Sequence, residues 1–166
     1  PVSRAGLPSL EAMSLLVRSR RSTRRYLDEN VDPELLKNLL ATLANVPTGC
    51  NRMALTFTVI SDKEAMRNFQ DQALAILKRA AEDTRLPDRM VNLKAVALGR
   101  QARDIFFRTA PHALVVSAPP EAPCGHEDII LALAYFELLA NSAGLGTVWW
   151  GMLHSAASAV PELRNL

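Results

Sequence analysis

The stretch EDIILALAYFELLANSA occupies residues 127–143, and its spacing predicts a long helix. Apolar side chains, among them Ile129, Leu133 and Phe136, would cover more than one face of that helix. A helix that is hydrophobic nearly all round must be buried on several sides. The stretch is therefore predicted to form either the centre of the domain or an interface between subunits.

Two glycines, Gly144 and Gly146, follow this helix, and residues 147–150 (TVWW) predict a strand that runs into Gly151. A dinucleotide-binding fingerprint needs its glycines after a strand and before a helix, which is the reverse of this order. We therefore interpret the glycines as the end of the helix. Neighbouring residues of a strand face opposite sides, so one of Trp149 and Trp150 can lie in the core while the other meets a ligand or partner.

The rest of the chain alternates helical patterns with short apolar strands. Ser9 and the pair Asp32-Pro33 mark two helix starts, and Asp62 marks a third. Residues 91–107 return to helical spacing, and residues 55–60 and 113–118 are predicted strands. Helices interleaved with about three strands indicate an α+β fold, in one domain that covers residues 1–166.

Composition excludes several classes of protein for this chain. Hydrophobic residues make up 49% of the chain and charged residues 22%, which is typical of a globular protein. A net charge of +2 is too small to indicate a general nucleic-acid binder. Cys50 and Cys124 lie far apart without a C-x-x-C motif, so a reduced, cytoplasmic setting is predicted. No signal peptide and no stretch of about 20 apolar residues is visible, which predicts no membrane association.

A cationic cluster, RRSTRRY, occupies residues 20–26. Arginine forms a planar fork of donors that grips phosphate with two hydrogen bonds, and Ser22 can add a neutral one. A plain basic surface explains the cluster equally well. A nucleic-acid patch is disfavoured because no stacking aromatic residues are interleaved with the arginines.

A turn of small residues, PTGCN, follows at residues 47–51. Its backbone could let a flat ligand lie close to the amides. The turn could also be a simple helix stop before the strand that begins near Leu55, and taken alone this interpretation is favoured. Together, the cluster and the turn suggest a pocket for a phosphorylated, planar cofactor.

No constellation of side chains indicates a catalytic residue or a metal site. Cys124, His126, Glu127 and Asp128 form a short polar run, but no second cluster has the spacing of zinc ligands. Glu127 and Asp128 are instead expected to favour the helix N-terminus through its dipole. No Ser-His-Asp or paired-carboxylate arrangement is visible, so an enzyme built on this chain would borrow its reactive group from a cofactor.

Taken in order, these motifs resemble the nitroreductase family of FMN-dependent oxidoreductases. The resemblance runs from about Ser14 to the C-terminus, and it rests on residues 20–26, 47–51, 57–60, 110–116 and 143–151. The turn GCN at residues 49–51, Cys124 and the run YFELL at residues 135–139 resemble one subgroup, in which this domain often follows a small iron–sulfur ferredoxin segment. A ferredoxin is therefore one potential partner.

The resemblance implies an α/β sandwich, in which helices flank a central mixed or antiparallel sheet, and an intertwined homodimer with FMN at the subunit interface. It also implies three groups of cofactor-binding residues, which hold the phosphate and ribityl chain, reach the flavin from the partner subunit and line the isoalloxazine ring. In this order they are Arg20, Arg21, Ser22 and Arg24; Pro47, Thr48, Gly49 and Asn51; and Val148, Trp149, Trp150 and Gly151. The predicted helix at residues 127–143 would then be the core of the dimer.

The implied reaction is two-electron transfer from NADH or NADPH through FMN to a small electron-poor acceptor, such as a nitroaromatic or a quinone. No side chain is expected to act as a catalytic acid or base. Two features depart from the family pattern. Family members usually continue past Leu166 with a strand and basic residues that complete the phosphate site, so we expect either that the chain is truncated at its C-terminus or that this site is weaker than usual. Trp150 stands where many relatives carry a smaller or acidic residue.

Two alternatives stay open. The same fold could serve another flavin reaction, such as reductive dehalogenation or ferredoxin-coupled reduction. The chain could also be a non-catalytic module that binds a phosphorylated ligand through residues 20–25.

Overall fold

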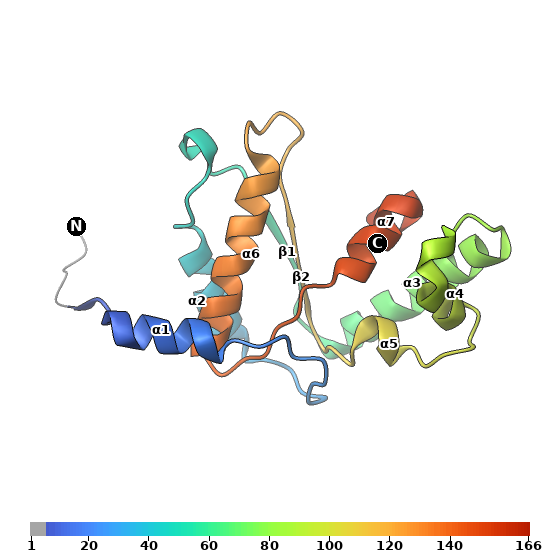
Figure 1. Ribbon diagram of the computed structural model, residues 1–166, viewed down its shortest axis with the longest axis horizontal. Coiled ribbons are helices and arrows are strands. Elements are labelled where there is room, and N and C mark those ends of the chain that lie inside the picture. Colours follow the sequence, from blue (N-terminus) through green and yellow to red (C-terminus); the bar gives the residue numbers. More distant parts are fainter. Residues whose placement is uncertain (1–5) are drawn as a thin grey trace. The chain divides into compact units, whose positions relative to one another are not determined.

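The computed structural model describes residues 6–166, and helices dominate it (Figure 1). In chain order the elements are α1 (Leu10–Ser19), α2 (Pro33–Leu43), β1 (Thr56–Ile60), α3 (Lys63–Glu82), α4 (Val91–Ala97), α5 (Asp104–Phe107), β2 (Ala113–Ser117), α6 (Gly125–Ser142) and α7 (Gly151–Ala159). Short 3₁₀ turns add Gly49–Asn51, Asp88–Met90 and Pro161–Asn165. Helices interleaved with strands confirm the predicted α+β class.

The chain divides into two compact units. Residues 6–23, 32–58 and 115–148 form the first unit, and residues 24–31, 59–114 and 149–166 form the second. Strands β1 and β2 pair with each other in antiparallel fashion, and the boundary between the units runs through both strands. The expectation of one domain over residues 1–166 stays a prediction, and residues 1–5 lie outside the described part of the chain.

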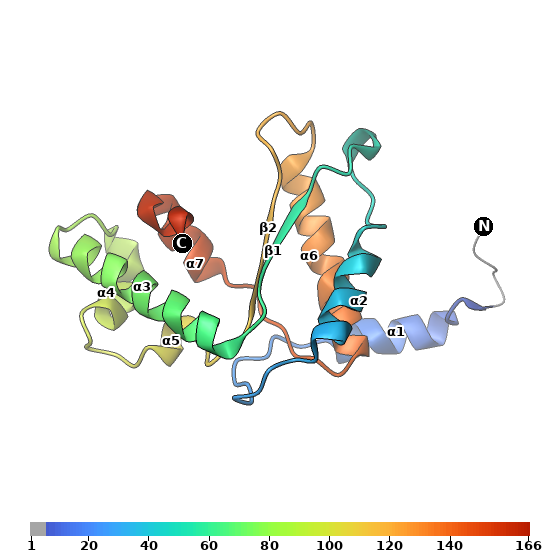
Figure 2. The same ribbon diagram turned by 180° about the vertical axis from the view of Figure 1, so that it is seen from behind.

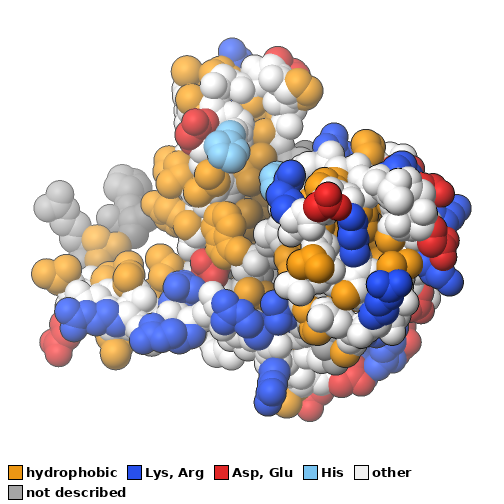
Figure 3. Space-filling model, turned by 45° about the vertical axis from the view of Figure 1, so that its right-hand side comes forward, with side chains coloured by type: hydrophobic (Ala, Val, Ile, Leu, Met, Phe, Trp, Pro, Cys, Tyr) orange, Lys and Arg blue, Asp and Glu red, His pale blue; other side chains and the backbone are white. Residues whose placement is uncertain are grey.

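In the first unit, α6 packs against both α1 and α2 (Figure 1). The core of this unit combines α2, the strands and one face of α6; its members are Leu40, Leu43, Val46, Leu55, Phe57, Val116, Ala132, Phe136 and Leu139. Figure 3 shows hydrophobic side chains gathered on the surface of this unit as well. On α6 the exposed large ones are Ile130, Leu131 and Tyr135, which we call the open face of α6. The helix is thus covered on one side and apolar on both, as its sequence predicts.

The second unit is a cluster of helices around an apolar core (Figure 2). Helix α3 packs on α4, and α4 packs on α5. Leu77, Phe106 and Phe107 are among its most deeply buried side chains. Trp150 packs against three rings, with centroid distances of 6.1 Å to Phe69, 5.4 Å to Phe106 and 5.6 Å to Phe107.

The predicted helix boundaries that depend on short-range hydrogen bonds are confirmed. The side chains of Ser9, Asp32 and Asp62 each accept a hydrogen bond from a backbone N–H two or three residues on, at 2.8–3.1 Å. These bonds satisfy donors that the first turn of a helix leaves unpaired. Gly144 follows α6 with a φ of +77°, which is the conformation that glycine adopts most readily after a helix end.

Two predicted elements are wrong. Residues 147–150 do not form a strand, because Thr147 makes only an isolated parallel bridge with Ser22 and α7 begins at Gly151. The aromatic contacts of Trp150 give the physical reason, since they turn the chain into the core of the second unit. The helix predicted over residues 91–107 is broken into α4 and α5, because Gly99 turns the chain with a φ of +68°.

A polar network in the second unit holds the segment that follows the arginine cluster. The Val31 N–H donates to His112 Nε2 at 2.8 Å, and the Asn30 amide donates to the Asp62 carboxylate at 3.0 Å. Burial lowers the pKa of His112, although the Asp62 carboxylate acts in the opposite direction. His112 is therefore neutral in the folded chain near pH 7, with Nε2 as the acceptor.

We predict that this network loses stability in mild acid. Because the folded-state pKa of His112 lies below its unfolded value of about 6.5, its contribution is fully present above that pH and is lost as the pH falls through the folded pKa. Protonation also removes the acceptor of the Val31 N–H. Urea midpoints of the wild type and of His112→Gln, compared from about pH 7.5 to about pH 5, test this. The variant should lose the pH dependence in that window, and equal slopes in the two proteins would contradict the assignment.

Candidate functional site

The arginine cluster borders a hollow in the first unit. The hollow has a volume of about 320 Å³, and its lining comes from the cluster, the end of α6 and the chain after α6: Ser19, Arg20, Arg21, Thr23, Asn141, Gly144, Leu145, Gly146 and Thr147. In Figure 3, Lys and Arg side chains form a row along α1 and the segment after it. Positive charge and main chain together make this hollow suitable for an anionic group.

The main chain of the cluster lies directly against the chain that follows α6. The Thr23 N–H donates to the Thr147 carbonyl at 2.8 Å, beside the bridge between Ser22 and Thr147. Gly146 makes this approach possible, because a Cβ atom there would lie 2.4 Å from Thr23 Oγ1. The glycine that sequence reasoning assigned to a helix end therefore also serves the candidate site.

Glu137 of α6 supports Arg20 without lining the hollow. Arg20 Nη1 lies 3.5 Å from Glu137 Oε1, and Thr147 Oγ1 donates to the same oxygen at 3.3 Å. The side chain of Glu137 is only 12% exposed, whereas that of Arg20 is 35% exposed. The carboxylate thus fixes one end of the guanidinium and leaves the other end accessible.

The predicted turn around Gly49 is held near the other end of α6. The Gly49 N–H donates to Asp128 Oδ1 at 2.9 Å, and Asp128 is 5% exposed. Asn51 has a positive φ of 52°, so the turn is tightly curved. A Cβ atom at Gly49 would lie 2.7 Å from Cys124 Sγ, which means that packing alone already requires a glycine here.

Sequence reasoning missed the contacts of Asp128 and Glu137. Asp128 lies in the first turn of α6 as predicted, but its carboxylate receives a hydrogen bond from a residue that is 79 positions away. The two acidic residues are nine positions apart, which in a helix is about 2.5 turns and about 14 Å. They therefore lie near opposite ends and on opposite sides of α6. Their partners are 79 and 117 positions away in the sequence, so no local pattern could have found these contacts.

The remaining predicted residues are divided between the units. Val148 belongs to the first unit, and Arg24, Trp149, Trp150 and Gly151 belong to the second. Trp149 is 47% exposed, whereas Trp150 packs against the apolar core of the second unit. The indole of Trp150 is thus used for packing, and Trp149 is the ring at the surface.

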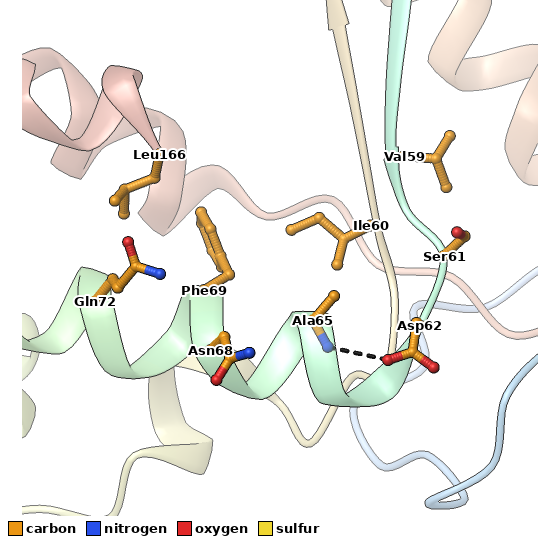
Figure 4. Close-up of a pocket in the computed structure, with 9 residues that line it drawn as sticks. All are labelled: Val59, Ile60, Ser61, Asp62, Ala65, Asn68, Phe69, Gln72 and Leu166. Atoms are coloured by element: carbon orange, nitrogen blue, oxygen red, sulfur yellow. Dashed lines mark hydrogen bonds between the residues drawn. The ribbon is translucent and has the colours of Figure 1, made fainter.

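A second hollow, within the second unit, contains none of the predicted site residues (Figure 4). It has a volume of about 380 Å³ and is lined by Val59, Ile60, Ser61, Asp62, Ala65, Asn68, Phe69, Gln72 and Leu166. The Asp62 carboxylate accepts the Ala65 N–H at 3.0 Å, and this bond lowers the pKa of Asp62. Because its lining contains a carboxylate and no basic side chain, this hollow is unsuited to a phosphate group.

Neither a metal centre nor a membrane-spanning helix is found among the described residues. There, no three His, Cys, Asp or Glu side chains are grouped so that they could hold a metal ion. In the same part of the chain, no helix is both long enough and apolar enough to span a bilayer.

The nitroreductase family model matches residues 17–166, which is nearly the whole chain. The chain belongs to the nitroreductase family. The resemblance inferred from its motifs is thereby confirmed.

Individual relatives agree with this assignment. A nitroreductase from Bacteroides fragilis, solved with bound FMN, has a TM-score of 0.73 at 20% identity, over 90% of this chain and 74% of that chain. The FMN-dependent nitroreductase of Mycobacterium smegmatis, solved in complex with NADPH, has a TM-score of 0.65 at 18% identity, over 94% and 82%. These two structures confirm the fold. The iodotyrosine deiodinase of Thermotoga neapolitana is 27% identical over 135 residues, which cover 80% of this chain and 70% of the deiodinase.

We predict that Gly146→Ala destabilises the first unit. The new methyl group would overlap Thr23, and overpacking of this kind costs about 1–3 kcal/mol. Gly151→Ala is the matched control, since a Cβ atom there meets nothing within 4 Å. Urea unfolding should show a lower midpoint for Gly146→Ala and an unchanged or higher one for Gly151→Ala. Equal midpoints for the two variants would contradict the close approach.

Proposed function

We propose that the protein is an FMN-dependent oxidoreductase that passes two electrons from NADH or NADPH to an electron-poor acceptor, such as a nitroaromatic or a quinone. Membership of the nitroreductase family supports the reaction class. The observation that carries the proposal is the hollow in the first unit, which Arg20 and Arg21 line together with residues 144–147. A lining with two arginines and no carboxylate suits the phosphate of a mononucleotide.

The residues of the chain would bind and orient the cofactor, and FMN when bound would supply the electron transfer. Arg20, Arg21, Ser22 and Arg24 are proposed to hold the phosphate and ribityl chain. Val148, Trp149, Trp150 and Gly151 are proposed to line the ring system, with Trp149 as the exposed aromatic side chain. Pro47, Thr48, Gly49 and Asn51 are proposed to complete the site from a second copy of the chain.

A homodimer is part of this proposal. The open face of α6 leaves large apolar side chains in water, which is typical of a surface that another protein covers. Asp128 and Glu137, which hold two of the residue groups, lie near opposite ends of α6. A second copy packed on α6 would bring its own turn around Gly49 to the site and would bury the apolar face.

A second candidate function is reductive dehalogenation of a halogenated phenol. The relative that is 27% identical is an iodotyrosine deiodinase, and this observation favours the candidate specifically. This second function would use the same proposed cofactor and would differ from the first only in the electron acceptor. Anaerobic turnover with 3-iodotyrosine and with a nitroaromatic would separate the two, because iodide is released only in the first reaction.

A visible absorption spectrum of the protein mixed with FMN tests the proposal. A bound flavin spectrum that bleaches on anaerobic addition of NADH or NADPH is the expected result. A bound flavin that nicotinamide does not reduce would point to another donor, such as a ferredoxin. Absence of flavin binding would overturn the proposal and favour a non-catalytic phosphate-binding module.

We predict that Arg20→Ala and Arg24→Ala each weaken FMN binding. Each removes one charge-assisted contact to the cofactor, which is worth about 1.5–3 kcal/mol. Arg89→Ala is the matched control, because Arg89 is exposed and lies in a 3₁₀ turn that contains none of the proposed site residues. Fluorescence titration with FMN measures the three dissociation constants. Wild-type affinity in both cluster variants would contradict the site assignment.

A further inference from the structure

Two buried or nearly buried carboxylates of α6 have partners in the segments that the proposed site uses. Glu137 contacts Arg20 and Thr147, and Asp128 contacts Gly49. Desolvating a carboxylate is unfavourable unless hydrogen bonds or an opposite charge compensate for it. The donors that meet the two carboxylates, the Gly49 N–H and the Arg20 guanidinium, therefore make their burial tolerable.

The geometry at Glu137 concerns the orientation of one guanidinium. Arg20 has a flexible side chain that lines the hollow, and holding it in one orientation costs rotamer entropy. Its contact with Glu137 at 3.5 Å restricts that freedom, and the hydroxyl of Thr147 donates to the same carboxylate oxygen. The remaining N–H groups of Arg20 are then available to an anionic ligand.

The geometry at Asp128 concerns the position of a backbone turn. The Gly49 N–H would lack a protein acceptor without Asp128 Oδ1, which lies 2.9 Å away. The positive φ values of Cys50 and Asn51 make the turn costly for non-glycine residues, so it needs an anchor to persist. Asp128 is fixed in turn by its place in the first turn of α6.

We infer that Glu137 and Asp128 are positioning residues for the cofactor: Glu137 orients Arg20 toward the phosphate, and Asp128 holds the turn around Gly49 that reaches the ring. This inference rests on the proposed function. It assigns the two carboxylates to different parts of one ligand. Substitutions of Glu137 and of Asp128 should therefore differ in their effect on the binding of a ligand that lacks the phosphate. Riboflavin, which is FMN without its phosphate, is therefore the discriminating probe.

For Glu137, the test is the ratio of the dissociation constants for riboflavin and FMN. Glu137→Ala should weaken FMN binding about tenfold, which is the loss of one charge-assisted contact, and leave riboflavin binding within about twofold. Glu137→Gln keeps an oxygen that can accept from Arg20, so it should bind FMN about as well as the wild type. Glu137→Asp keeps the charge but shortens the side chain, so it should also weaken FMN binding selectively. It serves as the test variant if Glu137→Ala does not fold.

For Asp128, the expected change is independent of the phosphate. Asp128→Ala should weaken FMN and riboflavin by the same factor of about ten, and Asp128→Asn should restore both because its amide oxygen can accept the Gly49 N–H. Glu127→Ala is the matched control, because Glu127 is an exposed carboxylate in the same helical turn. Circular dichroism of each variant establishes that it is folded.

The outcomes separate this inference from the proposed function. If the wild type binds no flavin, both are overturned. If the wild type binds FMN but Glu137→Ala and Glu137→Asp weaken FMN and riboflavin equally, or weaken neither, the role of Glu137 is overturned alone. If Asp128→Ala binds both ligands as the wild type and Glu127→Ala do, the role of Asp128 is overturned alone.

Discussion

The first unit depends on how one apolar helix accommodates two carboxylates. Helix α6 buries Ala132 and Ala140 completely, and on either side of that buried stripe stand Asp128 and Glu137. Each is tolerated because a donor from a distant segment meets it, namely the Gly49 N–H and the Arg20 guanidinium. These polar contacts determine where the turn and the cluster attach to the helix, whereas the apolar contacts determine only that they are close to it.

Much of the secondary structure could be predicted, because its determinants are local. The caps at Ser9, Asp32 and Asp62 bond within three residues, and the apolar spacing of α2 and α6 repeats within one helix. The strand predicted for residues 147–150 fails for the opposite reason. Trp150 meets Phe69 and Phe106, which lie far away in the sequence, and no local pattern records those contacts.

The candidate site likewise contains residues that could be predicted from the sequence and residues that could not. Arginine and small-residue motifs could be recognised from residue types, since phosphate and close backbone approach each require a particular chemistry. The residues that hold those motifs could not be recognised, because Arg20 and Glu137 are 117 positions apart and a carboxylate in a first helical turn is explained by the dipole alone. Gly146 is the clearest example of what the sequence does not predict. A glycine after a helix is already explained by the helix end, so nothing in the sequence indicates its close approach to Thr23.

The open face of α6 follows from the same distribution of residues around the helix. The buried stripe and the two carboxylates occupy one half of its circumference, and Ile130, Leu131 and Tyr135 on the other half are 39–46% exposed. A closed two-fold dimer would cover this face with an identical one and would repeat every site twice. In such a dimer, a change on the open face would alter the position of α6, and with it both segments that Asp128 and Glu137 hold. Assembly and cofactor binding are therefore expected to depend on one helix rather than on separate parts of the fold.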